Sequence, residues 1–191
     1  VNVMKAVDEN PNLVRQACES GADAIVMGAG LPLDLPDMVA DFPDVALLPI
    51  LSDARGVTVV LKKWLRRGRV PDAIVIEHPG HAGGHLGATR LEELNDARFD
   101  FARVRDEVSS ALRGLGLSDA DLPLVAAGGI NRHERVRELL DGGRSAVQLG
   151  TAFAVSAEGY AHPRFKEVLA GARPEDIVEF ISVAGLPARA V

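Results

Sequence analysis

The stretch that decides the fold runs from residue 73 to residue 88 and reads Ala73-Ile-Val-Ile-Glu-His-Pro-Gly-His-Ala-Gly-Gly-His-Leu-Gly-Ala88. Its first four residues are apolar and rich in β-branched side chains, which is typical of a strand buried on both faces. The segment that follows carries three of the chain's five histidines and four glycines. Glycine lets a ligand approach the backbone closely, and histidine changes its protonation near neutral pH. A buried strand followed by such a loop predicts a functional site in an α/β fold.

The rest of the chain alternates strand-like and helix-like hydrophobic patterns. The predicted strands are residues 1–7, 23–27, 45–51, 73–77, 122–127 and 146–149, and a tail with strand character covers residues 177–183. The predicted helices cover residues 10–20, 57–65, 101–115 and 131–140 and the region around 165–169, with a loop and short helix at 32–44. Two helix starts carry capping signals, which are Asn10 before Pro11 and the pair Asn131 and Glu134.

This β-α alternation, with buried strands and short loops, demands a parallel sheet covered by helices. Such a sheet can stay open and doubly wound, or it can close as a TIM-type (β/α)8 barrel of roughly 250 residues. We favour the barrel, because six barrel strands alone would leave two hydrophobic edges unpaired. The chain opens on Val1 inside a predicted strand, so we expect the first two β-α units of the barrel to lie upstream. No low-complexity linker interrupts residues 1–191, which we interpret as one domain.

Composition limits the class of protein. A chain of 191 residues with 47% hydrophobic and 25% charged residues is typical of a globular protein with one sizeable core. The net charge of −6 argues against a nucleic-acid partner. No apolar run has the length of a membrane span, and no signal-peptide pattern opens the chain. We therefore expect a soluble, cytoplasmic protein without a membrane partner, and the sequence leaves homo-oligomerisation open.

Two residues that often attract functional interpretations are expected in the core instead. Cys18 is the only cysteine, so a disulfide and a cysteine-based metal site are both excluded. Its helical spacing with Leu13, Val14 and Ala17 predicts a buried thiol rather than a nucleophile. Trp64 belongs to a similar helical stripe and is predicted to be a core residue.

A phosphate site is predicted where two later strands end. Gly128-Gly129 follows the strand 122–127 directly, and Gln148-Leu149-Gly150-Thr151 closes the strand 146–149. In barrels, the loops after the last two strands commonly bind phosphate through backbone N–H groups and a helix N-terminus. Glycines permit that close approach, and the Thr151 hydroxyl can donate a hydrogen bond.

The histidines raise a metal site as an alternative. His78, His81 and His85 are clustered, and imidazoles suit zinc. However, no cysteine or carboxylate is obviously placed to complete the site, although Glu77 is adjacent, so we predict no metal. His133 and His162 are expected at the surface.

Several motifs together resemble the nitronate monooxygenase (2-nitropropane dioxygenase) family of flavin enzymes on a β/α barrel. The resemblance runs in order over essentially the whole chain. It is carried by Val1-Asn2-Val3-Met4, Ala82-Gly83-Gly84-His85-Leu86-Gly87, Ala126-Ala127-Gly128-Gly129-Ile130, Gln148-Leu149-Gly150-Thr151 and Gly185-Leu186-Pro187-Ala188-Arg189.

The resemblance implies FMN as the cofactor and assigns roles to residues by position. The phosphate is expected against Gly128, Gly129, Gly150 and Thr151, with Gln148 and Leu149 beside it. Asn2, Gly83 and Gly84 are expected near the flavin, and His85 is expected to be the catalytic histidine. His78 is also expected at the cofactor. It stands seven residues before His85, where the family usually has glutamine or glutamate, and Pro79 follows it where glycine is common.

The function that the resemblance implies is FMN-dependent oxidation of alkyl nitronates with molecular oxygen. His85 would act as the base that removes the α-proton of a nitroalkane, or would stabilise the bound anion by hydrogen bonding. A flavin reductase of the same fold that takes hydride from NAD(P)H, acting on enoyl thioesters or quinones, remains an alternative. A protein that binds flavin or a phosphorylated metabolite without catalysis is the alternative from another class.

Overall fold

The computed structural model describes residues 1–191 and contains a six-stranded, all-parallel sheet. Its strands are β1 (Asn2–Met4), β2 (Ala24–Gly28), β3 (Ala46–Leu51), β4 (Ile74–Glu77), β6 (Leu124–Ala127) and β7 (Ala146–Gln148). They follow one another across the sheet in the order β1-β2-β3-β4-β6-β7, so nearly every strand pairs with its neighbour in the sequence. The sheet is parallel, as the alternating pattern predicted, and it has the form of a half-barrel.

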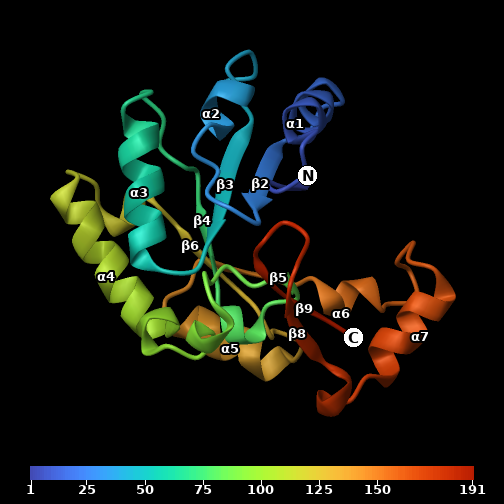
Figure 1. The fold of residues 1–191 in the computed structure, drawn as a ribbon. Coiled ribbons are helices and arrows are strands. Elements are labelled where there is room, and N and C mark those ends of the chain that lie inside the picture. Colours follow the sequence, from blue (N-terminus) through green and yellow to red (C-terminus); the bar gives the residue numbers. More distant parts are fainter.

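The helices are α1 (Asn10–Glu19), α2 (Leu35–Met38), α3 (Ala54–Leu65), α4 (Phe101–Gly114), α5 (His133–Asp141), α6 (Thr151–Ala154) and α7 (Pro163–Gly171). Short 3-10 turns are η1 (Pro79–His81), η2 (Leu91–Glu93), η3 (Ala97–Phe99), η4 (Asp119–Asp121) and η5 (Pro174–Asp176). Helices α3, α4 and α5 follow the outer side of the curved sheet, while α6 and α7 lie near the C-terminal strands (Figure 1). None of the helices combines the length and the apolar character that crossing a membrane requires.

The main core lies between the sheet and the helices that cover it. It is a cluster of 21 buried residues that includes Cys18 and Trp64. The Trp64 side chain is fully buried, and its indole Nε1 donates a hydrogen bond to the Pro32 carbonyl oxygen at 3.0 Å. Both residues are therefore core residues, as their helical spacing predicted.

The predicted capping signals were wrong at two helices. Helix α1 begins at Asn10 itself, with Glu9 at the N-cap position. The Asn10 amide instead donates to the carbonyl oxygens of Val7 and Lys5, at 2.7 and 3.0 Å, because the chain before the helix turns back over it. Helix α5 begins at His133, and no side chain caps it. Asn131 does not cap it because it lies earlier, in the loop that follows β6.

A second, smaller sheet joins segments that are far apart in the sequence. It contains β5 (Gly84–His85), β9 (Pro187–Ala190) and β8 (Val178–Ile181), in the antiparallel order β5-β9-β8. The tail at 177–183 was expected to have strand character, and β8 confirms this. Strands β5 and β9 were not predicted. The β8-β9 hairpin, drawn in red, stands beside the loop that follows β4 (Figure 1).

Candidate functional site

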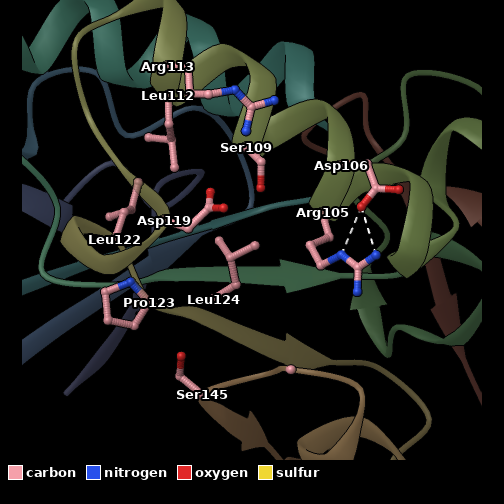
Figure 2. Close-up of a pocket in the computed structure, with 11 residues that line it drawn as sticks. Arg105, Asp106, Ser109, Leu112, Arg113, Asp119, Leu122, Pro123, Leu124 and Ser145 are labelled. Carbon is pink, nitrogen blue, oxygen red and sulfur yellow. Dashed lines mark hydrogen bonds and ion pairs between the residues drawn. The ribbon is translucent and has the colours of Figure 1, made fainter.

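A large cavity lies at the C-terminal ends of β4, β6 and β7, and has a volume of about 1060 Å³. A smaller cavity of about 430 Å³ lies at the opposite end of the sheet, beside helix α4 (Figure 2). Its polar rim includes Arg105 and Asp106, which hydrogen-bond each other at 2.8 Å. Parallel α/β folds place their ligands at the C-terminal ends of the strands, so the larger cavity is the candidate site.

Strand register brings three side chains to the same level at the base of this cavity. Glu77 at the end of β4 is paired with Ala127 of β6, which is paired in turn with Gln148 of β7. Both Glu77 and Gln148 line the cavity. The carboxylic acid and the amide therefore lie two strands apart at the same edge of the sheet.

The loop after β6 is built so closely against the loop after β4 that only glycine fits there. Gly128 and Gly129 have φ values of +95° and +67°, in the left-handed region. A Cβ on Gly128 would lie 3.2 Å from the His78 carbonyl oxygen, and one on Gly129 would lie 3.0 Å from the His81 Cβ. The two glycines therefore hold the predicted phosphate loop next to the histidine-rich loop.

The loop after β7 forms the third wall of the cavity and begins helix α6 at Thr151. A Cβ on Gly150 would meet no atom within 4 Å, so the space beside this backbone is open. A Cβ on Gly83 would lie 3.8 Å from the Thr151 hydroxyl oxygen, so the loops after β4 and β7 face each other. The cavity brings together most of the residues predicted from the sequence: Gly83, Gly84, Gly128, Gly129, Gln148, Leu149, Gly150 and Thr151.

Three predicted site residues do not line this cavity: Asn2, His78 and His85. Asn2 is exposed on β1, at the far edge of the sheet from β7. The His78 ring packs against the rings of His81 and Phe101, with centroids 4.8 and 6.0 Å away. Its Nδ1 accepts a hydrogen bond from the Gly80 N–H at 3.1 Å. Burial, and then the neighbouring His81, lower the pKa of His78, which favours the neutral ring.

His85 lies on β5, next to the cavity-lining glycines Gly83 and Gly84. Its backbone pairs with Ala188 of β9. Its ring is half-buried, and Nε2 lies 3.0 Å from the Ser182 hydroxyl oxygen. Ser182 comes from the turn between β8 and β9, so the C-terminal hairpin orients the histidine ring.

Glu77 is a site residue that sequence analysis did not assign to the site. Burial raises the pKa of its carboxyl group to about 7, so the group can gain or lose a proton near neutral pH. A signal was present in the sequence, because Glu77 is the only charged residue of the strand Ile-Val-Ile-Glu. A charged residue at the C-terminal end of a buried parallel strand faces the loop region rather than the core.

Arg189 and Glu179 are further lining residues that were not predicted. They are cross-strand neighbours on β9 and β8, and Arg189 Nη2 donates a hydrogen bond to Glu179 Oε1. Arg189 Nη1 also donates to the Ala82 carbonyl oxygen at 2.8 Å. Arg189 belongs to the final motif of the family resemblance, but nothing in the local sequence indicates that it reaches the loop after β4.

The remaining histidines lie outside the cavity. His133 and His162 are exposed, as predicted. The His162 Nδ1 accepts a hydrogen bond from the Arg164 N–H at 3.1 Å and caps helix α7. No group of three or more histidine, cysteine, aspartate or glutamate side chains is arranged to hold a metal ion.

Two solved structures illustrate which proteins share this fold. FabK from Thermotoga maritima superimposes with a TM-score of 0.72 and 25% sequence identity, over 99% of this chain and 52% of that chain. A nitroalkane oxidase from Streptomyces ansochromogenes has a TM-score of 0.65 and 24% identity, over 92% of this chain and 47% of that chain. The chain therefore spans about half the length of these two similar structures.

Comparison at the level of sequence identifies the family. A nitronate monooxygenase from Pseudomonas aeruginosa is 37% identical over 118 residues, which is 62% of this chain and 31% of that protein. The family model described as nitronate monooxygenase matches residues 1–191, which is the whole chain and includes every wall of the cavity. The chain belongs to the nitronate monooxygenase family.

Proposed function

We propose that the protein is an oxidoreductase that binds FMN and oxidises alkyl nitronates with molecular oxygen. We also propose that residues 1–191 act as one FMN-binding domain. The observation that carries the proposal is the meeting of three loops at one cavity: the Ala82–His85 loop, the Gly128-Gly129 loop and the start of α6. Membership of the nitronate monooxygenase family supports the same reaction.

The residues present fit a flavin mononucleotide. The backbone beside Gly150 is open, and the short helix α6 begins directly after it. Backbone N–H groups at such a position suit a phosphate, and the Thr151 hydroxyl adds a donor. The volume of about 1060 Å³ is just above the usual range of roughly 300–1,000 Å³ for cofactor sites, so a flavin mononucleotide has room. We therefore expect Gly128, Gly129, Gly150 and Thr151 to hold the phosphate, with Gln148 and Leu149 beside it and Gly83 and Gly84 nearer the ring.

His85 is the residue that we propose acts on the substrate. A nitronate is an anion, and a protonated imidazole can stabilise it by a charge-assisted hydrogen bond. A neutral imidazole can instead remove the α-proton of the parent nitroalkane. Ser182 fixes one ring nitrogen, which leaves Nδ1 for the substrate. FMN would supply the redox chemistry when bound, with the nitronate as electron donor and oxygen as electron acceptor.

The visible spectrum of the purified protein tests this proposal. We expect a flavin spectrum, or one that forms after FMN is added, that an alkyl nitronate bleaches in the absence of oxygen. Bleaching by NADH and not by the nitronate would favour a reductase of the same fold. Flavin binding without reduction by either donor would favour a non-catalytic binding protein.

His85→Asn tests the role of the histidine. We expect turnover to fall at least about 100-fold, within the range for loss of a general acid or base, while FMN is retained. His133→Asn is the matched control, because His133 is exposed on α5 outside the cavity. A His85→Asn variant with the turnover of the control would contradict the role.

A further inference from the structure

We propose that Arg189 is the positioning residue that holds the Ala82–His85 loop in place and thereby sets the position of the His85 ring. The inference rests on the proposed function only in taking His85 as the group that acts on the substrate. Arg189 itself is assigned no contact with substrate or flavin.

Arg189 occupies the centre of the small sheet. Its backbone pairs with Gly84 of β5 on one side and with Glu179 of β8 on the other. These two neighbours are more than 90 residues apart in the sequence, and β9 is the strand that lies between theirs in the small sheet. A change at this position therefore reaches both the histidine loop and the hairpin that carries Ser182.

The guanidinium group holds the start of the loop directly. Nη1 donates to the Ala82 carbonyl oxygen at 2.8 Å and, more weakly, to the Pro79 carbonyl oxygen at 3.5 Å. Nη2 donates to the Glu179 carboxylate, which balances the positive charge. The planar guanidinium can bind both partners at once, which a lysine ammonium on a flexible stem does less well.

Burial distinguishes the Arg189 contacts from those of Arg173. The Arg189 side chain is 15% exposed, whereas Arg173, which makes ion pairs in the same C-terminal region, is 74% exposed. Hydrogen bonds to charged groups gain strength away from water, while exposed ion pairs contribute little. The Arg189 contacts are therefore suited to holding a backbone segment in place.

The loop needs such a hold, because Gly83 and Gly84 separate Ala82 from His85 and are the most flexible residues available. Apart from the Arg189 side chain, β5 is joined to β9 only by a two-residue backbone ladder and by a hydrogen bond from the Leu86 N–H to the Pro187 carbonyl oxygen at 2.9 Å. Without the guanidinium, we expect the Ala82 end to move and the His85 ring to lose its position beside Ser182. A displacement of about 1 Å at a reacting group can cost on the order of 100-fold in rate.

The test uses the full chain with Arg189→Met, Arg189→Lys and, as the matched control, Arg173→Met. The first readout needs no substrate: NMR of the 15N-labelled His85 ring and hydrogen exchange of the Leu86 amide. We expect Arg189→Met to shift the His85 resonances and to speed Leu86 exchange about tenfold or more, as expected for loss of a local hold. Arg189→Lys should recover this only in part, and Arg173→Met should change neither.

The second readout is nitronate oxidation by the FMN-loaded protein. We expect Arg189→Met to lower kcat at least about tenfold with a changed pH profile, while FMN stays bound. If Arg189→Met does not fold, Glu179→Gln is the substitute variant, because it weakens the ion pair with the Arg189 guanidinium. It should shift the same His85 resonances to a smaller extent. Unchanged His85 resonances in folded Arg189→Met, or in Glu179→Gln if Arg189→Met does not fold, would overturn the inference. Shifted resonances in a protein that never turns over nitronate would leave it standing and refute the proposed function instead.

Discussion

His85 and Ser182 are hydrogen-bonded at 3.0 Å between Nε2 and Oγ, although 97 residues separate them in the sequence. His85 lies on β5 of the small antiparallel sheet, and Ser182 lies in the turn between β8 and β9. The candidate active histidine is therefore oriented by the C-terminal hairpin, whereas the glycines beside it belong to the loop after β4. The site depends on docking of the hairpin onto that loop.

Ser182→Ala should lower the rate of nitronate oxidation about fivefold, because loss of one hydrogen bond worth about 1 kcal/mol frees the His85 ring to rotate. FMN binding should stay the same. Steady-state rates and a flavin titration measure the two effects. Ser109→Ala is the control, since Ser109 lies on α4 beside the smaller cavity. Equal rates for both variants would mean that the contact does not orient the ring.

Gly150→Ala should weaken FMN binding about tenfold, or about 1.4 kcal/mol, with the fold intact. A methyl group here meets no protein atom within 4 Å but lies in the wall where we expect the phosphate. Flavin titration and thermal unfolding of the FMN-free protein check the two parts. Gly171→Ala, at the end of α7 with open space around it, is the control. A variant with unchanged FMN affinity would place the phosphate elsewhere.

Glu77 should make stability depend on pH. Its carboxyl pKa is about 7 in the folded protein against an ordinary 4.5, so the folded state holds the proton more tightly. The free energy of unfolding should therefore fall as pH rises from about 4.5 to about 7, by up to about 3 kcal/mol in total. Urea unfolding at several pH values measures this slope.

Glu77→Gln should remove that slope, because the amide stays neutral. The variant should match the original protein at pH 4 and be more stable above pH 7. Glu158→Gln is the control, since Glu158 is exposed and should leave the slope unchanged. An identical pH dependence for Glu77→Gln and the original protein would show that another group carries it.

Trp64→Phe should cost about 2 to 3 kcal/mol of stability, from a smaller side chain in the core and an unpaired carbonyl at Pro32. Circular dichroism during urea unfolding measures the loss. Tyr160→Phe should change stability by less than about 0.5 kcal/mol, because Tyr160 is fully exposed. A Trp64 variant as stable as the Tyr160 variant would contradict the core role.

Local patterns correctly predicted the parallel sheet and its alternation with helices. The run Ile74 to Ile76 is apolar at every position, and the apolar residues around Trp64 repeat at helical spacing. The local sequence of each element therefore indicates which of its faces is buried. The ends of elements were less reliable. Asn10 and Asn131 look like caps in sequence, but Asn10 bonds to carbonyls before its helix and Asn131 lines the cavity. A short polar side chain takes whichever partner the fold brings near.

The sequence by itself determined the alternation of strands and helices, the buried positions of Cys18 and Trp64, and the glycine-rich loops at the strand ends. Tertiary structure alone decided that Arg189 reaches the Ala82 carbonyl, that Ser182 reaches His85, and that the Glu77 pKa is raised to about 7. The physical reason is that hydrophobic periodicity is local. Hydrogen bonds between distant strands and the burial of a carboxyl group depend on which segments fold against each other.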